Sequence, residues 1–200
     1  YIAKRMGLPI ERLVIATNQN DILHRCLSTG TYAQGKLKPS ISPSMDIQIS
    51  SNFERALFDA YGRDGSALQA TMQEFSNTGQ VVLSENIMEA LKSHFVSGAA
   101  HEKQTLKTIK DTYAQTGELL CPHSAVGVHV AQHFLSSQTP MITLATAHPA
   151  KFPDAVEKAS GLKPALPKFM GDLYKRPERV TEVQNDLESL KTLIKERITS

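Results

Sequence analysis

The chain has 200 residues, of which 40% are hydrophobic and 21% charged, a composition typical of a globular domain that buries a core. The formal net charge is only +2, aromatic residues make up 6%, and no window gathers a dense Lys/Arg cluster, which excludes a basic or stacking surface for nucleic acid. The apolar runs are too short to span a membrane. We therefore expect neither nucleic acid nor a membrane as a partner.

The first residues have the pattern of a helix end. Tyr1 to Met6 precede Gly7 and Pro9, which typically stop a helix. A helix this short does not nucleate by itself, so we expect that the chain was cut from inside a longer element. The hypothesis is that it is the C-terminal part of a longer protein.

A strand is predicted at Leu13–Ala16, followed by the polar residues 17–21 and a helix to about Ser28 that Gly30 closes. This order is typical of one unit of a parallel sheet. Asn18 and Asn20 then lie at the carboxyl end of a strand, where ligands of open α/β sheets bind. The same side chains, with Asp21, are equally suited to capping the helix, so both interpretations stay open.

The middle of the chain is predicted to be mostly helical. Residues 45–50 alternate apolar and polar side chains as a strand does, and 51–54 match a capping box that opens a helix. Further helices are expected at about 66–76 and over 84–116, with one break at 98–100. We interpret residues 51–116 as an α-rich insertion between parallel sheet units.

A helix is predicted to start at Pro122 and to pack closely through small residues such as Gly127. His129 and His133 are one turn apart, as in zinc sites, but no third ligand follows at a matching spacing. We expect no metal there. Cys26 and Cys121 are expected to be buried, reduced thiols of a cytoplasmic protein, although sequence alone leaves a disulfide open.

The segment 141–156 carries the clearest candidate site. Residues 141–144 are an apolar run that predicts a buried strand, a polar turn follows, and Pro149 and Pro153 suit the first turn of a helix. Thr146 and His148 would lie where a small ligand meets the strand end, or they would cap the helix.

The tail differs in composition. Prolines space out a loop, and apolar residues at helical spacing then form a stripe from Val180 to Ile198. We expect a core domain over residues 1–165, and a loop with an amphipathic helix over 166–200. Docking of this helix on its own domain is favoured over dimerisation, so a monomer and a homodimer both stay open.

Several short motifs are more specific as an ordered set than any is alone. Together they closely resemble threonine synthase, in its microbial and fungal branch. They are Lys4–Ile10, Ala16–Leu23, Ser42–Gln48, Ser51–Arg55, Pro122–Gly127 and Leu144–Phe152.

The resemblance implies an α/β fold: part of the pyridoxal-phosphate fold type II, which is tryptophan synthase β-like. It implies pyridoxal 5'-phosphate as cofactor, and conversion of O-phospho-L-homoserine and water to L-threonine and phosphate. The family's Ser-Phe-Lys-Asp stretch, whose lysine carries the cofactor, and its Gly-Asn-Phe-Gly phosphate loop do not occur in this sequence. We therefore assign no catalytic residue and expect the chain alone to be inactive.

Within the chain, the resemblance gives a role to one residue, Thr146, whose counterpart meets the pyridine nitrogen of the cofactor. Asn18, Asn20, His148 and Lys151 are substrate-binding candidates. Two positions depart from the family pattern: Cys121 stands where an acidic residue is common, and Ser124 where threonine is common. The loss of charge at Cys121 puts any cap or hydrogen bond made there in doubt.

Two other hypotheses compete with a threonine synthase fragment. One is a threonine synthase-like phospholyase, which would eliminate phosphate from a related amino-alcohol phosphate. The other is a non-catalytic binding module derived from the same fold.

Overall fold

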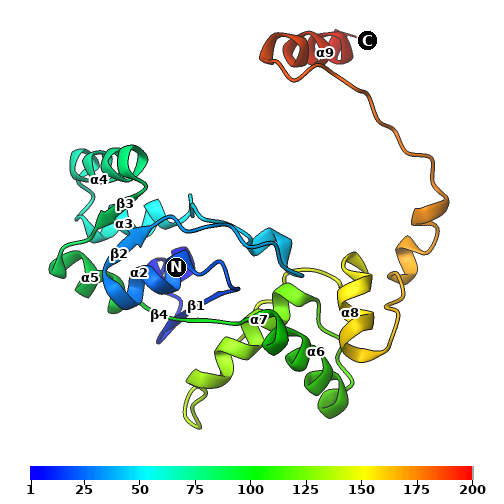
Figure 1. The fold of residues 1–200 in the computed structure, drawn as a ribbon, viewed down its shortest axis with the longest axis horizontal. Coiled ribbons are helices and arrows are strands. Elements are labelled where there is room, and N and C mark those ends of the chain that lie inside the picture. The colour runs from blue at the N-terminus through cyan, green and yellow to red at the C-terminus, as the bar shows by residue number, and fades with distance from the viewer. Residues whose placement is uncertain (200) are drawn as a thin grey trace. The chain divides into compact units, whose positions relative to one another are not determined.

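A computed structural model describes residues 1–199, with a boundary between two compact units at Ala165 and Leu166. The first unit holds the strands and most helices, and the second holds short 3-10 turns and one helix (Figure 1). Each unit is described by itself below.

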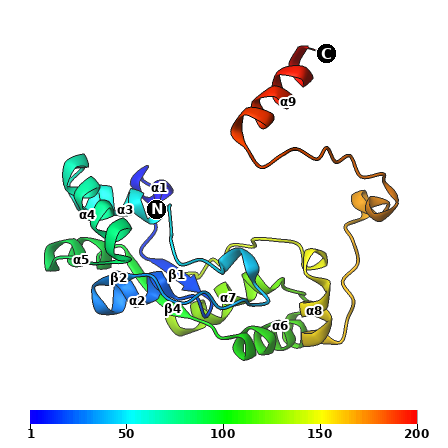
Figure 2. The ribbon, with the colours of Figure 1, turned by 45° about the horizontal axis from the view of Figure 1, so that its top comes forward.

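The first unit is organised around a parallel pair of strands, β1 (Leu13–Thr17) and β4 (Phe95–Ala99). Leu13 lies opposite Phe95, and Thr17 lies opposite Ala99. The pairing continues past the strands, because the amide of Ala100 donates to the carbonyl of Thr17 at 2.9 Å. Both strands therefore end at one edge of the sheet, as Figure 2 shows.

Helices α2 (Ile22–Thr29) and α7 (Pro122–Ala131) cover opposite faces of this pair. On the α2 side, His24 Nδ1 and Ser97 Oγ are 3.0 Å apart. The next residue, Gly98, faces α7, and a Cβ built on it would come within 2.7 Å of Val130 Cγ1. The alternation is that of a strand buried on both faces.

The main core lies on the α2 side. Tyr32 is 1% exposed, and its ring lies 4.4 Å from Phe75 and 5.3 Å from Phe53, measured between centroids. Its hydroxyl accepts the amide of Ser50 at 2.8 Å. The other elements of this core are β2 (Thr31–Ala33), α3 (Phe53–Ala60), α4 (Gly65–Thr78), β3 (Gln80–Val82) and α5 (Glu85–Lys92), with β2 and β3 antiparallel.

A second group of helices packs on the α7 side: α6 (Glu102–Thr116), α7 and α8 (Pro153–Ser160) (Figure 1). Each contributes a fully buried apolar side chain, namely Ile109, Val126 and Val156. Elsewhere lie α1 (Ile2–Arg5), α9 (Leu187–Thr199) and 3-10 turns at Pro43–Met45, Gln132–Phe134, Pro149–Lys151, Lys168–Met170 and Leu173–Lys175.

Local signals for helix ends are confirmed. Helix α2 ends at Gly30, which has a φ of 79°, a conformation that glycine adopts without strain. Helix α7 begins at Pro122. In the tail, α9 begins only at Leu187, so the first residues of the predicted apolar stripe, Val180 and Val183, precede the helix.

Three predictions of secondary structure are wrong. Residues 141–144 form no strand: within the described chain they have no ladder partner, and Ile142 and Leu144 are 81% and 77% exposed. Residues 45–50 form no strand: Met45 ends a 3-10 turn and residues 46–50 are irregular, because Asp46 and Gln48 both bind Asn20 instead of alternating across a sheet. Residues 95–99, expected to be largely helical, form β4, since pairing with β1 overrides the local pattern.

The expected capping box at 51–54 is also absent: α3 begins at Phe53, and its N-cap, Asn52, makes no side-chain cap bond.

Gly98→Ala should destabilise the fold by about 1–3 kcal/mol, because the new methyl group overpacks the contact with Val130. Gly65→Ala is the matched control: a Cβ there meets nothing within 4 Å, so no loss is expected. Urea unfolding of both variants measures the difference. Equal stabilities would contradict a tight α7–β4 contact.

Candidate functional site

The predicted site residues gather where β1 ends and α7 begins. Asn18 and Asn20 follow β1 and are 2% and 1% exposed. Asn18 Nδ2 donates to Asp46 Oδ1 at 2.7 Å and to Ser42 Oγ at 3.0 Å. Asn20 Nδ2 donates to the same Asp46 oxygen at 2.9 Å and to the carbonyl of Lys38 at 2.8 Å. The two amides thus tie an extended loop, residues 38–48, to the strand end.

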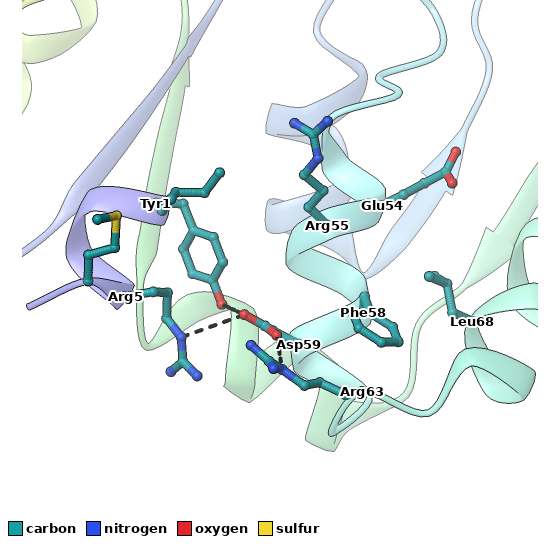
Figure 3. Close-up of a pocket in the computed structure, with 10 residues that line it drawn as sticks. Tyr1, Arg5, Glu54, Arg55, Phe58, Asp59, Arg63 and Leu68 are labelled. Atoms are coloured by element: carbon teal, nitrogen blue, oxygen red, sulfur yellow. Dashed lines mark hydrogen bonds and ion pairs between the residues drawn. The ribbon is translucent and has the colours of Figure 1, made fainter.

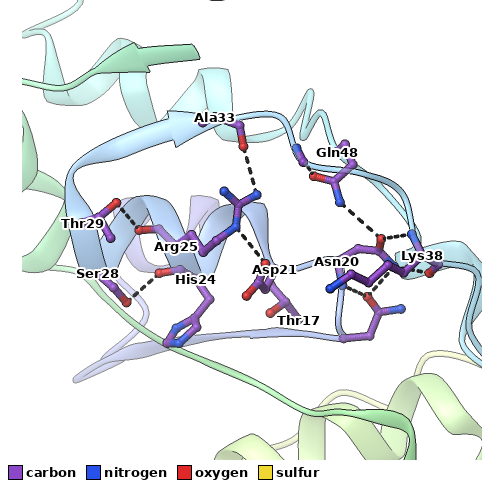
Figure 4. Close-up of polar contacts among 12 residues, drawn as sticks. Thr17, Asn20, Asp21, His24, Arg25, Ser28, Thr29, Ala33, Lys38 and Gln48 are labelled. Atoms are coloured by element: carbon purple, nitrogen blue, oxygen red, sulfur yellow. Dashed lines mark hydrogen bonds and ion pairs between the residues drawn. The ribbon is translucent and has the colours of Figure 1, made fainter. Parts of the chain in front are cut away.

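The side-chain oxygen of Asn20 also binds the loop 38–48. Its Oδ1 accepts the amide of Lys38 at 2.8 Å and Gln48 Nε2 at 3.3 Å (Figure 4). The N-cap of α2 is Asp21, whose carboxylate instead accepts Arg25 Nε at 2.9 Å. Capping of α2 by Asn18 and Asn20, left open from sequence, is therefore wrong, and their role in substrate binding stays a prediction.

His123 joins this loop to α7. The backbone amide of Ser44 donates to His123 Nε2 at 3.1 Å, and the imidazole lies 4.5 Å from the ring of Phe152. An amide can only donate, so Nε2 is the unprotonated nitrogen and Nδ1 carries the proton. That Nδ1 is buried and has no hydrogen-bond partner among the described residues.

Charge and burial keep this imidazole neutral. Burial lowers the pKa of His123, the positive charge of Lys151 lowers it further, and Asp46 opposes both effects. Sequence reasoning noted the motif around His123 but gave His123 no place in the site, and it missed Asp46. Chain order gives no sign that these two groups lie close together.

Thr146 is held by the first turn of α7. Its amide donates to Ser124 Oγ at 3.1 Å, and the two hydroxyl oxygens are 3.2 Å apart. Cys121 is the N-cap of α7: its sulfur accepts the amide of Ser124 at 3.4 Å and lies 3.2 Å from Ser124 Oγ. Thr146 as a residue is exposed, and its hydroxyl is oriented by α7.

The departure from the family pattern at Cys121 had put a cap or hydrogen bond at this position in doubt. The N-terminal cap of α7 is nevertheless made, and the group that makes it is the Cys121 thiol. Burial raises the pKa of Cys121, but hydrogen bonds with Ser124, Thr146 and the amide of Ala147 outweigh it and leave the pKa below the ordinary value. Cys121 and Ser124 are contacts of Thr146 that sequence reasoning did not assign.

His148 and Lys151 lie on the adjoining turn and are exposed. His148 Nδ1 accepts the amide of Ala150 at 3.2 Å and caps the short 3-10 helix, which confirms the capping interpretation for this residue. In the neutral ring Nε2 then carries the proton and can donate. Lys151 Nζ lies 5.6 Å from the centroid of Phe152, in cation–π contact.

A separate cavity of about 580 Å³ lies between α1 and α3 (Figure 3). Asp59 binds several groups that line it: Asp59 accepts Tyr1 Oη at 2.8 Å and Arg63 Nε at 3.0 Å, and Arg5 Nε lies 3.6 Å away. None of the predicted site residues lines it. Among residues 1–199 no cluster of three His, Cys, Asp or Glu side chains is arranged to hold a metal ion.

Comparisons of the sequence with known proteins give one family. Residues 124–194 match the family model described as threonine synthase, C-terminal. The chain is 46% identical over 196 residues to threonine synthase from Pseudomonas aeruginosa. The aligned region covers 97% of this chain and 42% of that protein.

Solved structures give the same result. A pyridoxal-phosphate-bound threonine synthase from Brucella melitensis superposes with a TM-score of 0.92 at 48% identity, over 98% of this chain and 42% of that one. The yeast threonine synthase gives a TM-score of 0.87 at 36% identity, over 100% and 44%. The chain thus spans about two fifths of the length of the proteins it matches.

The fold is therefore α/β, with the parallel strands and covering helices found in structures of pyridoxal-phosphate-dependent threonine synthases. The resemblance seen in the motifs is confirmed. The chain corresponds, in sequence and in fold, to the C-terminal part of the threonine synthase family. Within the described residues, no helix has the length and apolar character needed to cross a membrane.

Acidification should weaken the fold through His123. Its pKa is lowered in the folded protein, so below about pH 6.5 the unfolded chain takes up a proton that the folded site resists. Stability is complete above that pH and falls as the pH approaches the lowered value, with a slope of at most about 1.4 kcal/mol per pH unit.

Urea unfolding between pH 7.5 and 5 measures this slope, with His123→Gln as the comparison. Burial also lowers the pKa values of His94 and His129, but these two histidines contribute equally to the pH dependence of stability in both proteins. The difference between the two slopes therefore measures the contribution of His123. Parallel curves would contradict the neutral, buried imidazole.

Proposed function

We propose that this chain supplies the C-terminal part of a threonine synthase, which converts O-phospho-L-homoserine and water to L-threonine and phosphate with pyridoxal 5'-phosphate. The observation that carries the proposal is the hydroxyl of Thr146, an exposed residue in a motif on which the family resemblance depends, and this hydroxyl is held by Ser124. The similarity to a pyridoxal-phosphate-bound relative supports the choice of cofactor.

The donors present suit a pyridine nitrogen. Within residues 1–199, the side-chain hydrogen-bond partners of Thr146 are a hydroxyl and a thiol, with no carboxylate among them. Thr146 would therefore donate a hydrogen bond to an unprotonated ring nitrogen and would not supply it with a proton. When bound, the cofactor withdraws electrons from the substrate carbons, and a neutral nitrogen makes that withdrawal milder.

The remaining candidates are proposed to bind the substrate. His148 and Lys151 present exposed donors on one turn, and Lys151 adds the positive charge that a phosphate requires. The side-chain amides of Asn18 and Asn20 donate their hydrogen bonds to the loop 38–48. We therefore assign both residues an indirect contribution to substrate binding, through the position of that loop.

We place the lysine that carries the cofactor outside this chain, since the Ser-Phe-Lys-Asp stretch does not occur in its sequence. The chain alone is then inactive. We further propose a cytoplasmic enzyme. Cys26 and Cys121 are buried and not bonded to each other, which suits a reducing compartment.

Thr146→Val in the complete protein that contains this chain should weaken binding of pyridoxal phosphate about threefold to tenfold, because one hydrogen bond is lost. Thr146→Ser keeps the hydroxyl and should bind nearly as wild type does. Absorbance titration of the cofactor measures affinity, and assays of threonine and phosphate measure the reaction.

Equal yields of threonine and phosphate support the synthase. Phosphate without threonine would instead identify a phospholyase, and a complete protein that takes up no cofactor would identify a binding module.

Lys151→Gln should raise the KM for O-phospho-L-homoserine about tenfold or more, because it removes a charged contact to the substrate phosphate. It should lower kcat as well, because this phosphate leaves during the reaction and the charge that develops on it loses the same contact. Lys158→Gln is the control, since Lys158 is an exposed lysine on α8 that pairs with Glu102. Steady-state kinetics distinguish the two variants. An unchanged KM in Lys151→Gln would remove this residue from the substrate site.

A further inference from the structure

We infer that Ser124 is a positioning residue: it directs the hydroxyl proton of Thr146 outward, toward the pyridine nitrogen of the cofactor. The inference rests on the proposed function, because it concerns the same cofactor site. It assigns a role to a side chain of α7 that lies behind Thr146.

The direction of the hydrogen bonds follows from the donors available. The amide of Thr146 donates to Ser124 Oγ at 3.1 Å, so this oxygen is an acceptor there. The proton of Ser124 Oγ can then be given to Thr146 Oγ1 or to Cys121 Sγ, each 3.2 Å away.

The oxygen is the better acceptor. Sulfur accepts hydrogen bonds weakly, and Cys121 Sγ already accepts the amide of Ser124 as the N-cap of α7. Ser124 therefore donates to Thr146 Oγ1. Thr146 Oγ1 also lies 3.7 Å from Cys121 Sγ, but this contact is long and sulfur accepts weakly, so a ligand nitrogen is the better acceptor for the proton of Thr146. Thr146 is exposed, so a ligand can reach that proton.

A hydroxyl that accepts a hydrogen bond also donates a stronger one. Ser124, which is 4% exposed, thus acts on the ligand only through Thr146. Cys121 fixes the start of α7 and with it the position of Ser124.

A double-mutant cycle tests this dependence. In the complete protein, Ser124→Ala should weaken binding of pyridoxal phosphate about threefold to tenfold and change the ratio of the absorbance bands of the bound cofactor. In a Thr146→Val background the same change should have no further effect, because the hydroxyl through which Ser124 acts is gone. Ser124→Thr keeps a donor and should restore both the affinity and the spectrum.

Ser160→Ala is the matched control. Ser160 is also a partly buried hydroxyl that bonds locally, to the carbonyl of Val156, and its loss should leave affinity and spectrum unchanged. Thermal unfolding without cofactor shows whether Ser124→Ala folds. If it does not fold, Ser124→Cys replaces it in the same test, since cysteine keeps the packing and removes the strong donor.

Equal effects of Ser124→Ala with and without the Thr146 hydroxyl would overturn the inference, and so would an unchanged spectrum in Ser124→Ala. These outcomes require a wild-type protein that binds the cofactor. A wild-type protein that binds none contradicts the proposed function itself, and the two failures are therefore distinguishable.

Discussion

Parallel pairing of β1 with β4 is the interaction on which the rest of the first unit depends. It joins residues far apart in the chain, such as Ala16 and Gly98, and ends both strands at one edge. Two parallel strands need helices on both faces, and here α2 and α7 provide them. Gly98 permits α7 to approach closely, because any side chain there would meet Val130. The position of α7, and so of Ser124 and Thr146, follows from this approach.

The edge where β1 ends is shaped by polar groups that satisfy one another. Asp46 accepts hydrogen bonds from Asn18, Asn20 and Ser40, which fixes a loop that is irregular apart from the 3-10 turn Pro43–Met45. Buried polar groups of this kind specify one arrangement, because leaving any of them without a partner costs about 1–3 kcal/mol. The neutral imidazole of His123 then extends the same network from the loop to α7.

The sequence predicts those structural features that depend only on residues close together in the chain. Gly30 and Pro122 indicate the ends of helices correctly, because their backbone preferences act within one turn. β4 was missed since its structure depends on a strand far away in the chain, and residues 141–144 were wrongly predicted as a strand because an apolar run does not show whether a partner strand lies beside it.

In the candidate site, too, the sequence predicts features that depend on neighbouring residues and misses those that depend on distant contacts. Thr146 was found by its motif, whereas Asp46, His123 and Ser124 acquire their contacts only when loops separated in sequence meet.

The N-terminus of α7 gives the proposed site a common electrostatic character. Helix N-termini carry a partial positive charge, and Cys121, His123 and Ser124 all lie at or within the first turn of this helix. A positive field favours the thiolate over the thiol and the neutral imidazole over its cation, which agrees in sign with the lowered pKa of Cys121 and of His123. Under the proposed function, the same field opposes protonation of the cofactor's ring nitrogen at Thr146. A neutral hydroxyl would then be a fitting partner for that nitrogen, since it donates to the unprotonated form that the start of α7 favours.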